Sequence, residues 1–214
     1  MPLLALDAAL GLASAAVLED GRVLALETGK AGATHLAVLA KQALHTAGLA
    51  SRDLEAVAAS VGPGSFTGIR TALALATGIG LATGKPVIGV SVGEALAAIL
   101  PTPPPRTLWV AIDSGRGQIF LERAGAVAVF DLAAIPVPSG PVLIAGNAAG
   151  PVVERLSREG ADARLAPLST ADAVALGLAG EARLAGRLPA RRPLPLYIDL
   201  PAARLPTDLR PLPT

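Results

Sequence analysis

Residues 60–70 read Ser-Val-Gly-Pro-Gly-Ser-Phe-Thr-Gly-Ile-Arg (SVGPGSFTGIR), and this stretch joins a strand to a long helix. The strand is predicted over 57–61, a short apolar run that ends at a Gly-Pro-Gly turn. Ser65 is the expected N-cap of a helix over 65–83, and Gly84 is its expected end. A buried strand followed directly by a helix is typical of an α/β fold.

One face of this predicted helix is made of small residues at every fourth position. The small residues are Gly64, Gly68, Ala72, Ala76, Gly80 and Gly84. Residues four apart share a helix face, so another element can approach this seam closely. Each glycine costs a helix about 1 kcal/mol relative to alanine, so close packing is the expected compensation. The seam either packs within the chain or binds a second subunit, and the sequence leaves both open.

The rest of the chain alternates between predicted strands and helices. A hairpin turn is expected at Asp20-Gly21, an N-cap at Thr34, and a capping box at Ser91 and Glu94. The other predicted strands cover 3–6, 13–18, 23–27, 87–90, 108–112, 118–122, 127–130 and 142–144, and the other predicted helices cover 34–47, 91–100, 148–158 and 170–186.

The proline-rich stretch 101–105 (PTPPP) is the expected boundary between two units. Its prolines exclude it from a helix or a central strand. We therefore predict domains over 1–101 and 106–214. Each opens with a strand that ends in an aspartate, Asp7 or Asp113, followed by a tight hairpin, which predicts two related βββαβα-type halves.

The composition excludes several classes of site. The chain has no cysteine, so it has no disulfide and no thiolate ligand. Its net charge is +1, and the excess of six arginines over three acids in 181–214 is read as a solvated tail in preference to a contact with RNA or a partner. No secretory signal is visible, and the apolar run 71–84 is shorter than the roughly 20 residues of a spanning helix. A cytoplasmic protein without a membrane segment is expected.

Three motifs that would carry chemistry are incomplete. The Gly62-Pro63-Gly64-Ser65 turn could bind an anion at a helix N-terminus, but it lacks the Gly-Lys-Ser/Thr of a phosphate loop. Ser65 also lacks the flanking glycines of a nucleophile elbow, so a capping role is favoured. His35 and His45 lie ten residues apart on one predicted helix and do not pair at metal-ligand spacing.

Asp7 and Asp113 are the remaining candidate acids. Each stands at a predicted strand end, where a magnesium-bound nucleotide could lie. The alternative is an aspartate that bonds its own turn, which fits Asp113-Ser114-Gly115 well.

The stretch 60–70 closely resembles the signature of the TsaB family, also called YeaZ, the dimerisation subunit in threonylcarbamoyl-adenosine (t6A) modification of tRNA. Leu4-Ala5-Leu6-Asp7, Thr34-His35, 86–91 (PVIGVS) and 110–117 (VAIDSGRG) support the resemblance in kind and order. The first departure is Ala8, where the family often has threonine. The second is Gln118, Ile119 and Phe120, which replace the last three residues of the Arg-x-Gly-Glu-Val-Tyr that often follows the second aspartate. The third is Asp199, near a position that is often basic.

The resemblance implies a two-lobed actin/Hsp70-like (ASKHA) ATPase fold and a non-catalytic subunit that binds and activates TsaD. ATP and metal are then expected on partner subunits, and TsaE is expected to join the complex. The chain would contact tRNA only indirectly, through the complex. The same helices could also form a homodimer. Asp7 and Asp113 would mark a vestigial nucleotide site. The implied interface residues are His35, Leu36, Leu39, Ala43, Phe66, Gly68, Ile69, Ala72, Ala76 and Gly80.

Two other functions stay open. One is an active ATP-dependent kinase or acyltransferase of the same fold, with Asp7 and Asp113 as its acids. The other is a metalloprotease, which the lack of paired histidines disfavours.

Overall fold

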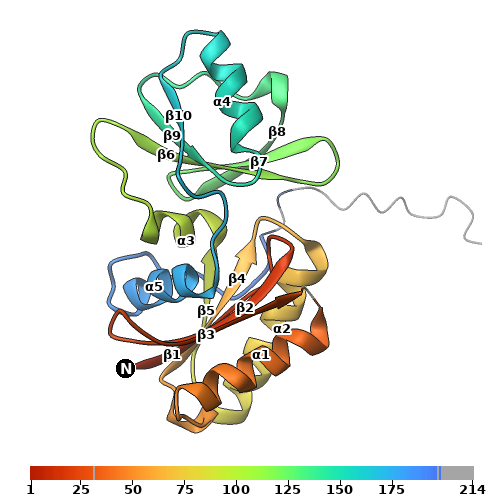
Figure 1. Ribbon diagram of the computed structural model, residues 1–214, viewed down its shortest axis with the longest axis vertical. Helices are drawn as coiled ribbons and strands as arrows, with labels where there is room; N and C mark the ends of the chain where they lie inside the picture. Colours follow the sequence, from red (N-terminus) through yellow and green to blue (C-terminus); the bar gives the residue numbers. More distant parts are fainter. Residues whose placement is uncertain (31, 197, 199–214) are drawn as a thin grey trace, which may run out of the picture.

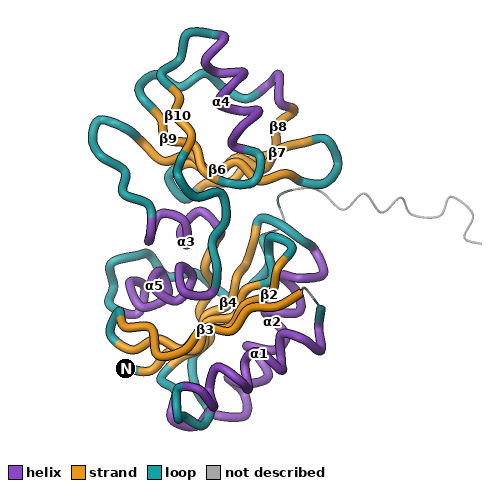
Figure 2. The backbone as a smooth tube through the Cα atoms, in the orientation of Figure 1, coloured by secondary structure: helices purple, strands orange, loops and turns teal. Residues whose placement is uncertain are grey.

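The computed structural model describes residues 1–30, 32–196 and 198, and its core is a pair of five-stranded sheets (Figures 1 and 2). The first sheet has the order β3-β2-β1-β4-β5. Its strands are β1 (Pro2–Asp7), β2 (Leu12–Glu19), β3 (Arg22–Lys30), β4 (Ala56–Gly62) and β5 (Val87–Ser91). β1, β2 and β3 form an antiparallel meander, whereas β4 and β5 run parallel to β1.

The second sheet repeats this order as β8-β7-β6-β9-β10, with β9 and β10 parallel to β6. Its strands are β6 (Thr107–Asp113), β7 (Gln118–Arg123), β8 (Ala126–Asp131), β9 (Val142–Ala145) and β10 (Ala163–Leu165). The paired βββαβα-type halves are therefore confirmed, with one difference. Where the first half has helix α1 (Ala33–Thr46), the second has only a 3₁₀ turn, Leu132–Ala134.

The other helices are α2 (Phe66–Thr83), α3 (Val92–Ile99), α4 (Ala149–Arg158) and α5 (Ala173–Leu184). The caps predicted for α2 and α3 are confirmed. Ser65 Oγ accepts the Gly68 N–H at 3.2 Å, and Ser91 and Glu94 form the reciprocal capping box. The N-cap of α1 is Gly32, so the prediction of Thr34 is wrong; Thr34 lies inside the helix.

Helix α5 returns to the first sheet, which corrects the predicted second domain 106–214. The Ala173 N–H donates to Ser14 Oγ at 2.9 Å, and Leu176 joins a core cluster with Leu3 and Leu18 of the first sheet. The first sheet is thus covered by α1 and α2 on one face and by α5 on the other (Figure 1). Only the segment that contains β6 to β10 forms the second unit.

A buried carboxylate joins the two units. Glu122 of β7 accepts the Ser91 hydroxyl at 2.5 Å and the Gly93 N–H at 2.9 Å, so it binds the first turn of α3. A Cβ on Gly93 would lie 2.3 Å from this carboxylate, which explains the glycine. The sequence analysis missed this contact because Glu122 is distant from Ser91 in the chain.

Candidate protein-binding face

The seam of small residues on α2 faces the chain's own first sheet. A Cβ on Gly68 would lie 1.9 Å from the Ala8 carbonyl oxygen, and one on Gly80 would lie 2.6 Å from a Val87 methyl. Ala72 and Ala76 between them are fully buried. Of the two interpretations that the sequence left open, internal packing therefore holds for this face.

Most of the predicted interface residues are consequently not on a free surface. Gly68, Ile69, Ala72, Ala76 and Gly80 of α2 are buried against the sheet. On α1, Leu36, Leu39 and Ala43 are buried in the same core cluster. The periodicity of small and apolar residues reports the face that a helix buries, and here the sheet already occupies that face. Of the ten, only His35 and Phe66 are exposed.

The opposite face of α2 is uncovered and carries two large apolar side chains. Phe66 is 68% exposed and Leu81 is 82% exposed, and Ala74 and Gly78 lie exposed between them. Large apolar side chains this exposed are usually found at binding surfaces when they group on one element. We call the surface formed by these four residues the outer face of α2.

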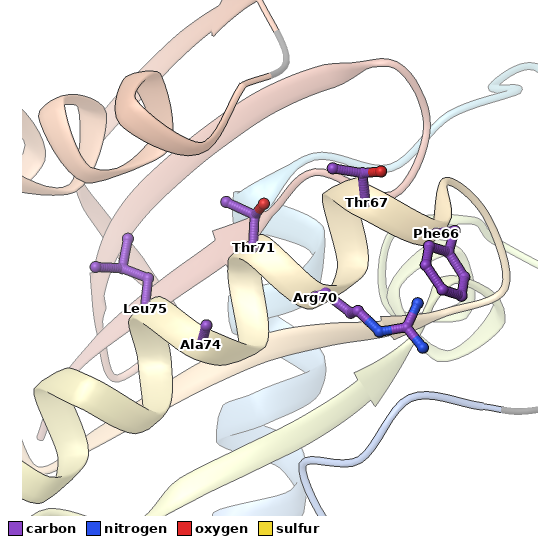
Figure 3. A pocket seen from close by; sticks show the side chains of 6 residues that line it. All are labelled: Phe66, Thr67, Arg70, Thr71, Ala74 and Leu75. Atoms are coloured by element: carbon purple, nitrogen blue, oxygen red, sulfur yellow. The ribbon is translucent and has the colours of Figure 1, made fainter. Parts of the chain in front are cut away.

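A shallow groove of about 490 Å³ lies at the beginning of the outer face (Figure 3). Its lining residues are Phe66, Thr67, Arg70, Thr71, Ala74 and Leu75. The Arg70 guanidinium lies 3.3 Å from the centroid of the Phe66 ring, so the two side chains form one stacked surface. Figure 3 shows Thr67, Thr71 and Leu75 along one side of the helix and the Phe66–Arg70 pair at its start.

The outer-face residues other than Phe66 were missed by the sequence analysis. A signal exists for Ala74 and Gly78. Positions 66, 70, 74 and 78 repeat every four residues, two positions away from the seam, and most of α2 is apolar. By length and composition, α2 is also the single helix among the described residues that could cross a membrane, and a third of it is buried inside the fold.

Asp7, the first candidate acid, lies at the end of β1 beneath the start of α2. It is 6% exposed, and its Oδ1 accepts the Ala9 N–H at 3.1 Å. Burial raises the pKa of Asp7 to about 6, and the nearby Asp172 adds to the rise. The space that Asp7, Ser60 and Asp172 line is too narrow to admit a water molecule.

Asp113, the second candidate acid, is held by its own turn. Its Oδ1 accepts the Gly115 N–H at 2.8 Å, and its backbone N–H donates to Asn147 Oδ1. Across the described residues, no cluster of three or more histidine or acidic side chains that could hold a metal ion is found. Asp7 therefore has no space for a hydrated cation beside it, and the exposed Asp113 carboxylate already bonds its own turn.

Comparison with known proteins agrees with this architecture. The model of the family TsaD, tRNA N6-adenosine threonylcarbamoyltransferase, matches residues 21–185. The chain belongs to this family. A transferase of that name from Erythrobacter litoralis is 34% identical over 151 residues, which are 65% of this chain and 43% of that protein. The one from Maricaulis maris is 33% identical over 138 residues, covering 60% and 37%. The chain spans less than half the length of these TsaD proteins.

Comparison with solved structures identifies the TsaB (YeaZ) family and the fold. YeaZ from Pseudomonas aeruginosa superimposes with a TM-score of 0.73 at 29% identity, over 92% of this chain and 99% of that one. A ROK hexokinase from Thermus thermophilus gives a TM-score of 0.51 at 16% identity, over 87% of this chain and 100% of that one, which shows the fold alone. The predicted ASKHA fold and the resemblance to TsaB (YeaZ) are thus confirmed.

Proposed function

We propose that this chain is a non-catalytic subunit for t6A modification of tRNA, and that it acts by binding and ordering a TsaD catalytic subunit through the outer face of α2. The observation that carries the proposal is the uncovered apolar face with Phe66 and Leu81 on a helix whose other face is fully packed. The family match supports a role in t6A modification of tRNA. The YeaZ-like fold supports a partner role, because the TsaB (YeaZ) family that the chain resembles is a dimerisation subunit.

The candidate acids favour the non-catalytic role. A nucleotide site needs accessible carboxylates that can hold a hydrated cation. Asp7 lies in a space that does not admit water, and Asp113 bonds its own turn. Chemistry on ATP is therefore assigned to the partner subunits, TsaD and TsaE, and contact with tRNA is assigned to the assembled complex in the cytoplasm.

The binding face is proposed to extend from α2 to the exposed side of α1. His35 and Val38 are exposed there, and Val38 is 51% exposed. Two adjacent helices offer the partner a ridged surface into which its own helices can pack. Without TsaD, two copies of the chain are proposed to associate through the same helices.

The test is a reconstitution with purified proteins. TsaD, TsaE, ATP with magnesium, a threonylcarbamoyl donor and tRNA are assayed for t6A with and without this chain. The proposal expects t6A only when the chain is present, and no ATP turnover by the chain alone. If the chain alone hydrolysed ATP with magnesium and Asp7→Asn abolished that activity, the chain would be an enzyme and the proposal would be wrong.

A further inference from the structure

Helix α3 lies between the two units (Figure 1). Its Ala95 belongs to the core cluster that contains Leu176 of α5, whereas its Leu96 belongs to the cluster that contains Ile112 of β6. The chain itself passes between the units twice, through residues 100–106 and 166–172. Apolar packing is non-directional, so it holds the units together without selecting one angle between them. That angle therefore depends on the directional bonds made at α3.

Glu122 of β7 supplies the directional bonds from the second unit. At 4% exposed, it is the most deeply buried charged residue in the part of the chain that the structure describes. Its Oε1 accepts the Ser91 hydroxyl and its Oε2 accepts the Gly93 N–H. The first N–H groups of a helix have no acceptor within the helix itself. Glu122 therefore caps α3 from the other unit, and we call its contact with Ser91 and Gly93 the latch.

Glu94 holds the same turn of α3 from the side of the first unit. Its Oε2 accepts the Ser91 N–H at 2.8 Å, and Ser91 Oγ accepts the Glu94 N–H at 3.1 Å. Its Oε1 accepts from Arg183 of α5 and from Arg191. The first turn of α3 is thus bound to the first unit through Glu94 and to the second unit through Glu122.

Breaking the latch would leave polar groups without partners in a buried place. Burial raises the pKa of Glu122, and the bonds from the Ser91 hydroxyl and the Gly93 N–H oppose that rise. A buried carboxylate and a buried N–H are both costly when they lose their hydrogen bonds. A rotation of one unit against the other that pulled Glu122 away from α3 would incur both costs together. The latch therefore favours a single arrangement of the two units.

We propose that the latch of Glu122 on Ser91 and Gly93 holds the two units at one angle and makes them a single rigid body, with or without nucleotide. The units then turn against each other only when both bonds to α3 break. This inference goes beyond the proposed function, because it concerns the chain by itself and holds whether or not TsaD binds.

The test measures the distance between the two units of the full chain. Because the chain has no cysteine, Arg52→Cys and Ser157→Cys place one spin label at an exposed position in each unit. Double electron–electron resonance is recorded on labelled chain diluted with unlabelled chain, so that the distances are those within one chain. The chain with an intact latch is expected to give one narrow distance distribution, which ATP with magnesium leaves unchanged. Glu122→Ala is expected to widen that distribution at least twofold.

Two controls separate loss of the latch from loss of folding. Asp131→Ala removes an exposed carboxylate from the neighbouring strand β8 and should leave the distribution unchanged. A label pair at Lys41 and Arg52, both in the first unit, should keep its distance in every variant.

Glu122→Gln keeps the shape of the side chain but leaves one of its two donors without an acceptor, so it should also widen the distribution, and it decides the test if Glu122→Ala does not fold. A wide distribution with the latch intact, a shift on addition of ATP with magnesium, or an unchanged width in a folded Glu122 variant would overturn the proposal.

Discussion

The two faces of α2 carry different residues and lie in opposite environments. The inner face is Gly68, Ala72, Ala76 and Gly80, packed so closely that a Cβ on Gly68 would overlap the Ala8 carbonyl oxygen. The outer face has Phe66 and Leu81, both more than half exposed. The inner face shows that small residues mark where the fold has packed already. The outer face shows that large apolar residues on a packed helix mark a surface left for a partner.

The largest effect is expected on the inner face. Gly68→Ala places a Cβ 1.9 Å from the Ala8 carbonyl oxygen, so α2 must move away from the sheet. We expect a loss of about 3 kcal/mol in the free energy of unfolding, measured by urea denaturation. A loss below 1 kcal/mol would mean that α2 does not pack on β1 as described. The larger change Gly68→Leu is expected to prevent folding, so it does not test partner binding.

A buried carboxylate below the same helix gives a pH-dependent effect. Burial raises the pKa of Asp7 to about 6 in the folded chain from its ordinary value of 3.8, so the folded state binds more protons and its stability falls as pH rises from about 4 to 6. Asp7→Asn keeps an oxygen for the Ala9 N–H. We expect this variant to be more stable than the wild type by about 2–3 kcal/mol at pH 8, with no difference near pH 4.

Thermal and urea denaturation at both pH values check this prediction. A difference that is the same at pH 4 and pH 8 would contradict burial of an ionisable carboxylate at this position. Asp113→Asn is the matched control, because that side chain is exposed.

A charged substitution tests the outer face of α2. Phe66→Asp is expected to weaken binding to TsaD by about 2 kcal/mol or more, because apolar aromatic residues at the centre of interfaces dominate affinity. The free energy of unfolding should change by less than about 0.5 kcal/mol. Val137→Asp is the control, since Val137 is 52% exposed in the loop after the 3₁₀ turn Leu132–Ala134. Equal weakening by both variants would show that the effect is not local to α2.

The smallest effect is a gain in stability on the outer face. Gly78 lies within α2, and a Cβ there meets no atom within 4 Å. Gly78→Ala is expected to add about 1 kcal/mol to the free energy of unfolding, because alanine has the higher helix propensity. Gly68→Ala should lower the free energy of unfolding and Gly78→Ala should raise it, although the two residues are only ten apart on one helix. Such opposite changes would sharpen the distinction between the two faces of α2.

Much of the fold follows from local signals in the sequence. The Asp20-Gly21 hairpin has positive φ at both residues, as its sequence predicts, and the caps at Ser65 and Ser91 form where hydroxyl side chains precede helices. Strand β10 was missed because three residues carry too little periodicity to be recognised. The return of α5 to the first sheet was missed because it depends on tertiary packing of Leu176 with Leu3 and Leu18.

The candidate site was harder to predict for a physical reason. Periodicity reveals that α2 has a small-residue face, but not whether the chain itself supplies the surface that packs against it. Gly68 was chosen as an interface residue on that ground, and the Ala8 carbonyl already occupies the space beside it. Phe66 was identified through the family resemblance, and Leu81 became visible only from its exposure.

The most direct test of the account is the solvent exposure of two side chains. Hydroxyl-radical footprinting of the full chain, alone and in complex with TsaD, measures oxidation of Phe66 and Leu81, with Val137 as an internal reference. The account predicts that complex formation lowers oxidation of Phe66 and Leu81 several-fold and leaves Val137 unchanged. A complex that forms while Phe66 and Leu81 stay as reactive as in the free chain would contradict the assignment of the outer face of α2 as the partner-binding surface.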